Sequence, residues 1–132
     1  MLFRSVSMVP YALSTTSADF FIHVSHLAAH TADMIANARV SLLIISPDAE
    51  SAQSRARVTV QGDAYQLAGE SPEYAVAKVA YIERFPNSAG IFELGDFSIF
   101  RIAPISARVV GGFAQAFSAD ADSYARALRE QA

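Results

Sequence analysis

Turn-forming residues interrupt this chain of 132 residues at short and regular intervals, so its secondary-structure elements are expected to be short. The stretches between the turns carry the alternation and the β-branched or aromatic residues that are typical of strands. Such strand patterns cover residues 3–13, 20–24, 40–46, 55–67, 97–105 and 107–113. Many short strands with few helices favour a small antiparallel barrel over a βαβ sheet. We therefore expect one mainly β domain over residues 1–132, a six-stranded antiparallel β-barrel with inserted helices.

Three stretches predict helices. An apolar stripe with helical spacing begins just after Ser25 and predicts a helix of about ten residues. Ser71 has the position of a helix cap and Pro72 that of a first-turn proline, so a second helix opens there and ends at Pro86. A short charged helix is expected at 119–131, near the C-terminus.

Two features of the strand patterns predict where strands lie in the sheet. The run 40–46 (VSLLIIS) is almost wholly apolar, which is typical of a strand covered on both faces. We therefore expect this strand at the centre of the sheet. Pro104 lies near the junction of the last two strand patterns and has no N–H to donate, so it is expected at an edge or a bend.

The composition indicates a subunit interface. Hydrophobic residues make up 52% of the chain and charged residues 17%, against about a quarter charged in an average soluble domain. So short a chain cannot bury all of this apolar surface in one core. We therefore expect a homodimer.

Charge and cysteine content exclude several classes of protein. The formal net charge is −3 and the 10 basic residues are scattered, which argues against nucleic-acid binding. The chain has no cysteine, so disulfides, thiolate nucleophiles and cysteine-bound zinc are excluded, and a cytoplasmic location is expected. Ser5, Ser7 and Pro10 interrupt the N-terminal apolar stretch, and no run reaches the roughly 18 apolar residues of a membrane span. We therefore expect neither export nor a membrane partner.

The junction between the second strand and the first helix is the best candidate for a binding site. The first backbone N–H groups of the helix would lie beside the hydroxyl of Ser25, with His30 and Thr31 one turn further along. Unpaired donors and the positive end of the helix dipole attract a phosphate. The alternative is that Ser25 is only the N-cap of the helix.

Other candidate chemistry is weaker. His23, His26 and His30 suggest a metal, but no acidic residue converges on them, so we predict no metal site. Arg55 and Arg57 share one face of a strand, where a guanidinium either binds an anion or is an ordinary surface group. The carboxylates form no evident pair, and no GxSxG motif is present, so we predict no catalytic residue.

A family resemblance rests on seven sequence blocks that occur in order along nearly the whole chain. They are SMVPYA (7–12), SxLAxHT (25–31), NxRVSLL (37–43), RxRVTVxGxA (55–64), RFP (84–86), GDFSIFRI (95–102) and VGGFAxA (110–116). This succession resembles the pyridoxamine 5′-phosphate oxidase-related, FMN-binding split-barrel family, and more narrowly its branch of haem-utilisation proteins. The resemblance implies a six-stranded Greek-key split barrel, homodimeric, with FMN in a groove between the subunits.

The resemblance also implies site residues and an activity. The positions that match FMN contacts in the family are Ser7, Met8, Val9, Pro10, Tyr11, Ser25, Leu27, His30, Thr31 and Arg57. An FMN-binding flavoprotein, an FMN-dependent oxidoreductase, is thereby implied. Oxidation of pyridoxamine phosphate itself is not expected, because Arg101 is followed by Ile102 and Ala103 where the family's oxidases carry an Arg-x-His pair.

Three alternatives stay open at this point. The chain could bind or degrade haem, with His23, His26 or His30 as axial ligand. It could be a dimeric module that has kept the barrel but binds no cofactor. A deazaflavin in the same groove is the third alternative.

Overall fold

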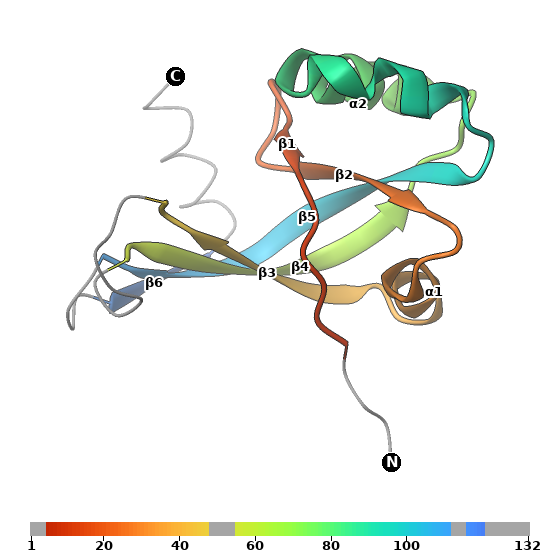
Figure 1. Cartoon of the computed structure of the whole chain (residues 1–132). Coiled ribbons are helices and arrows are strands. Elements are labelled where there is room, and N and C mark those ends of the chain that lie inside the picture. The colour runs from red at the N-terminus through yellow and green to blue at the C-terminus, as the bar shows by residue number, and fades with distance from the viewer. Residues whose placement is uncertain (1–4, 48–54, 112–115, 121–132) are drawn as a thin grey trace. The chain divides into compact units, whose positions relative to one another are not determined.

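The computed structural model describes residues 5–47, 55–111 and 116–120 and consists mainly of antiparallel β-strands with three helices (Figure 1). The strands are β1 (Ala12–Leu13), β2 (Phe20–Ser25), β3 (Arg39–Ile45), β4 (Arg57–Gln66), β5 (Phe97–Val110) and β6 (Ala116–Asp120). The helices are α1 (Ala29–Ala36), α2 (Pro72–Arg84) and the 3-10 helix η2 (Pro86–Glu93). The mainly β class with inserted helices is therefore confirmed.

The strand count differs from the expected six-stranded barrel. The hydrogen-bonded path runs β1-β2-β5-β4-β3 and contains five strands, and β6 pairs with β5 beside this path. The first of the five, β1, has only two residues. The fold is consistent with a split barrel, but its strand path has five strands and not the predicted six.

The chain divides into two compact units. The first comprises Met1–Ala38 and Ala64–Ala103, and the second Arg39–Asp63 and Pro104–Ala132. The first unit therefore holds β1, β2 and all three helices. The second holds β3, β6 and most of β4.

The core of the first unit surrounds β2. Phe20, Phe21, Ile22, His23 and Val24 are all buried, so this strand is covered on both faces. Phe21 of β2 and Ile99 of β5 pack in one cluster with Ala77 of α2. Figure 1 shows α2 across β1 and β2, with which it makes contacts.

Local sequence signals explain α2. The Oγ of Ser71 accepts a hydrogen bond from the backbone N–H of Tyr74 at 3.1 Å, and Pro72 occupies the first turn. Such a cap satisfies one of the free donors at a helix start, and proline there gives up no hydrogen bond. The helix ends at Arg84, and Pro86 begins η2. The predicted helix is confirmed at both ends.

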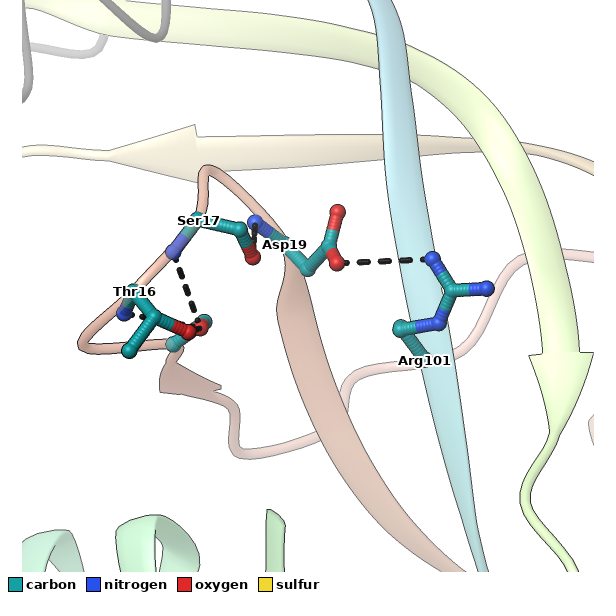
Figure 2. A network of polar contacts seen from close by, with 5 residues as sticks. Thr16, Ser17, Asp19 and Arg101 are labelled. Carbon is teal, nitrogen blue, oxygen red and sulfur yellow. Dashed lines mark hydrogen bonds and ion pairs between the residues drawn. The ribbon is translucent and has the colours of Figure 1, made fainter. Parts of the chain in front are cut away.

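A polar turn leads from β1 into β2. The backbone N–H groups of Thr16 and Ser17 donate to Ser14 Oγ at 3.2 and 3.1 Å. Figure 2 shows the Asp19 carboxylate at the end of this turn facing Arg101 of β5, with Oδ2 3.4 Å from a guanidinium nitrogen. Because both side chains are partly solvated, this ion pair orients the turn more than it stabilises it.

The N-terminal strand prediction is wrong for most of its length. Residues 3 and 4 of the predicted strand 3–13 lie outside the described residues. Of residues 5–13, only Ala12 and Leu13 pair with β2, and residues 5–11 have no regular structure. Pro10 has no N–H for a ladder, and Val6 and Met8 are exposed, so no buried face holds this segment in a sheet.

Two further strand predictions are corrected. The apolar strand β3 lies at the end of the path, paired on one side with β4, and its residues alternate between exposed and half-buried. Residues 97–110 form one strand instead of two. Pairing of β5 with β2 stops at Ile102 and pairing with β6 starts at Ser106, so Pro104 lies between two ladders where its missing N–H is tolerated.

The predicted C-terminal helix over 119–131 is not found where it can be checked. Ala119 and Asp120 belong to β6, and residues 121–131 lie outside the described residues. Gly112 and Phe113, predicted as the end of a strand, also lie outside them. None of the helices in the described ranges has both the length and the apolar character needed to cross a membrane.

Candidate functional site

Residues 25–31, which we call the β2–α1 corner, are held by hydrogen bonds that converge on Ser25. Its carbonyl oxygen accepts from the N–H of Ala28 at 3.1 Å and from the hydroxyl of Thr31 at 2.6 Å. Its Oγ accepts from the N–H of Leu27 at 3.1 Å. Thr31 is buried, whereas Leu27 is exposed and His30 half-buried.

The alternative that Ser25 caps the helix is wrong. The N-cap of α1 is Ala28, which makes no side-chain hydrogen bond. Ser25 instead ends β2, where it pairs with Phe97 of β5, and three residues separate it from the first helical residue. Because its Oγ serves only as an acceptor among the described contacts, the Ser25 hydroxyl keeps its proton for another acceptor.

The N-terminal segment lies against α1. Ser5 donates a hydrogen bond from its hydroxyl to the carboxylate of Asp33. Val6 and Met8, which follow, are 98% and 97% exposed, and Leu27 of the corner is 87% exposed. These are the three most exposed large apolar side chains of the described residues, and we call them the apolar patch.

Three other predicted site residues line a cavity whose lining includes no residue of the β2–α1 corner. Val9, Pro10 and Tyr11 line an open cavity of about 630 Å³ together with residues at the C-terminal end of α2, among them Arg84 and Phe85. Tyr11 also packs edge-to-face against Phe20, with ring centroids 5.5 Å apart. The predicted set is therefore split between the corner and this cavity.

Arg57 belongs to the second unit, in β4. Its guanidinium donates to the carbonyl oxygen of Arg55 at 3.4 Å, a weak contact. Ser7 is exposed at the start of the chain's described part. The predicted contacts of Arg57 and Ser7 with a cofactor stay predictions.

His23 belongs to an aromatic cluster under α2. Its ring stacks on Phe92 with centroids 3.9 Å apart and planes 8° from parallel, and Tyr81 and Phe97 lie at 5.6 and 5.1 Å. Burial, and then the charge of Lys78, lower the pKa of His23 below its usual value. This histidine is therefore a neutral part of the core.

His26 takes part in a polar contact that sequence reasoning missed. Its Nε2 contacts the hydroxyl of Ser98, which also accepts from the amide of Gln66 at 3.0 Å. Ser98 and Gln66 line a second cavity of about 370 Å³. The partners of His26 are more than 30 residues away along the chain, and no local pattern could have indicated them.

Metal ligands do not gather in the described ranges, where no three His, Asp or Glu side chains come together. Imidazoles that can each bind one metal ion are present at His26 and His30, and the exposed Leu27 lies between them in the sequence. This arrangement suits a planar cofactor that carries its own metal better than a bare ion.

Comparison with known proteins identifies relatives for nearly the whole chain. A chloroplastic heme oxygenase, HOZ, of Arabidopsis thaliana is 39% identical over 115 residues, which are 87% of this chain and 34% of that protein. The heme oxygenase HutZ of Vibrio cholerae is 29% identical over 121 residues, 89% of this chain and 68% of HutZ. A heme-binding protein from Mycobacterium smegmatis superposes with a TM-score of 0.80 at 29% identity, over 89% of this chain and 48% of that one.

The homologues are haem oxygenases and haem-binding proteins. The chain spans about a third of the length of HOZ and about half of the mycobacterial protein. A structure from the pyridoxine phosphate oxidase family, from Clostridium acetobutylicum, shares the fold alone, with a TM-score of 0.57 at 8% identity. No protein-family model matches the chain.

These relatives correct the cofactor prediction. The resemblance to the haem-utilisation branch is supported, whereas the FMN-binding oxidases are only distant neighbours. The expectation of an FMN flavoprotein with oxidoreductase activity is wrong, because these relatives are named as haem oxygenases and a heme-binding protein. Both cofactors join a planar ring to anionic groups, so residue chemistry at the corner did not separate them.

Proposed function

We propose that this chain binds haem at the β2–α1 corner. The observation that carries the proposal is the match to proteins named for haem over 87% and 89% of the chain. The residues of the corner fit such a group. Imidazole is a common ligand of haem iron, and His26 and His30 lie here.

The apolar patch fits the ring of the cofactor. Val6, Met8 and Leu27 are almost fully exposed, so their apolar side chains are available to a planar apolar ring. The Ser25 hydroxyl, free to donate, suits a propionate. Bound haem would supply an iron centre for dioxygen or electron chemistry.

A haem titration tests the proposal. Wild-type protein is expected to give a saturable change of the Soret band at micromolar haem. Leu27→Asp is expected to weaken binding about 10-fold, because it removes an apolar contact from the patch. Its matched control is Val76→Asp, at an exposed position of α2, which is expected to bind as the wild type does. Failure of the wild type to bind haem saturably would contradict the proposal.

We propose further that a second copy of the chain covers β3. Leu43 and Ile45 of this strand and Ile105 of β5 are exposed, and no residue of β3 is buried. β3 also ends the strand path, so one of its edges pairs with no strand among the described residues. Light scattering is expected to give twice the 14.2 kDa of one chain, and Leu43→Lys is expected to shift the mass toward 14.2 kDa. A wild-type mass of one chain at tens of micromolar would exclude this dimer.

A further inference from the structure

The open cavity beside the C-terminal end of α2 is not used by the proposed haem binding. All of its lining residues belong to the first compact unit, and its volume of about 630 Å³ lies within the range of small-molecule sites. Its aliphatic lining residues are Val9, Pro10, Leu13 and Ala80. The cavity therefore offers an apolar wall to a ligand.

Two side chains of opposite charge line the same cavity without neutralising each other. Glu83 and Arg84 are both exposed and lie in the last turn of α2. In the part of the chain that the structure describes, neither side chain makes a hydrogen bond or an ion pair. Neighbouring positions on a helix do not face each other, which explains why the two charges stay separate. Both charges are therefore available to a bound molecule.

The surroundings of the two charges indicate which ligand group each would bind. The guanidinium carbon of Arg84 lies 4.7 Å from the ring centroid of Phe85, and this contact orients the guanidinium without occupying its N–H donors. Such donors bind a carboxylate in a fork geometry. Glu83 lies at the C-terminal end of α2, where the backbone carbonyl oxygens of a helix add partial negative charge. The Glu83 carboxylate and the helix end together favour an ammonium group.

We propose that this cavity binds a free aliphatic α-amino acid, independently of the haem binding proposed above. The ligand's carboxylate binds Arg84, its ammonium group binds Glu83, and its side chain packs on the apolar wall at Leu13. A carboxylate without an ammonium group would bring a second negative charge to Glu83, and an amine without a carboxylate would bring a second positive charge to Arg84. A zwitterion with an apolar side chain matches both charges and the wall.

Titration of the full chain with L-leucine, followed by ¹H–¹⁵N correlation spectra, tests the proposal. Saturable shifts are expected at millimolar leucine for amides within residues 9–15 and 80–85, which contain the cavity lining. Leucinamide lacks the carboxylate and N-acetyl-leucine lacks the ammonium charge, so each is expected to bind about 10-fold more weakly. Glycine lacks the apolar side chain and is expected to bind about 10-fold more weakly as well.

Variants of α2 with matched controls assign the binding to the two charges. Arg84→Gln and Glu83→Gln are each expected to weaken leucine binding about 10-fold. Lys78→Gln and Glu73→Gln remove the same charges from α2 at positions that do not line the cavity, so they are expected to bind leucine as the wild type does. None of the four side chains is buried, so each variant is expected to fold.

Three results would overturn the amino-acid site. The first is the absence of a saturable shift with leucine, and the second is equal binding of leucine and N-acetyl-leucine. The third is an equal loss of leucine binding in the cavity variants and in their controls, because the net charge of α2 would then determine binding. Haem uptake by Arg84→Gln and Glu83→Gln is expected to equal that of the wild type. A loss of haem uptake in these variants, with no leucine binding by the wild type, would assign the cavity to haem instead.

Discussion

Replacing Phe20 with alanine is expected to lower the free energy of unfolding by about 3–5 kcal/mol, as for other large aromatic side chains removed from a core. Phe20 is 0% exposed and begins β2, where it pairs with Leu13 of β1 and Ile102 of β5. Its ring also supports Tyr11 at the cavity below α2. The removed ring would leave a void between these elements. Urea unfolding followed by circular dichroism measures the change.

A matched control distinguishes the loss of stability caused by removing a buried side chain from that caused by removing apolar atoms at an exposed position. Val76→Ala removes two methyl groups from an exposed position of α2 and is expected to change stability by less than about 0.5 kcal/mol. Phe20→Leu keeps most of the volume and should lie between the two alanine variants. Similar losses in Phe20→Ala and Val76→Ala would show that Phe20 is not in the core.

Elements with their own end signals could be predicted from sequence. The cap at Ser71, the first-turn proline and Pro86 together set both ends of α2. The strand 20–24 was recognised from its β-branched and aromatic residues, and β2 covers it with one residue more. In these cases the forces that determine the element act within a few residues of it.

Elements whose form depends on a distant partner could not be predicted. Whether Pro104 ends a strand depends on which neighbour needs its N–H, and the gap between the ladders of β2 and β6 removes that need. The apolar run of β3 indicates coverage but not what covers it, and within one chain this strand lies at the end of the path.

Only the part of the candidate site that is determined by neighbouring residues could be predicted from the sequence. The change from strand to helix near Ser25 indicated the corner, and its hydrogen bonds to Leu27 and Thr31 are local. The contact of His26 with Ser98 and the enclosure of His23 by Phe92 join residues far apart in sequence. Local sequence could therefore indicate His30 at the corner, but not the surroundings of His23 and His26.

Replacing Thr31 with valine is expected to lower the free energy of unfolding by about 1–2 kcal/mol and to loosen the β2–α1 corner. The buried Thr31 hydroxyl donates to the Ser25 carbonyl oxygen at 2.6 Å, and valine keeps the shape but not the donor. Of the two hydrogen bonds described above to the Ser25 carbonyl oxygen, only the one from the Ala28 N–H then remains. Exchange of the Leu27 and Ala28 amide hydrogens is expected to become about 5- to 30-fold faster, and haem affinity to fall with it.

Thr31→Ser is the informative control because it loses the methyl group and keeps the hydroxyl. Its loss of stability is expected to be about 1 kcal/mol, close to that of the valine variant, since a buried methyl contributes about as much as one hydrogen bond. Amide exchange at Leu27 and Ala28 should nevertheless stay near the wild-type rate, because the bond to Ser25 persists. Equal exchange rates in the serine and valine variants would mean that the Thr31 hydrogen bond does not hold the corner, and that the backbone hydrogen bonds and the pairing of Ser25 with Phe97 suffice.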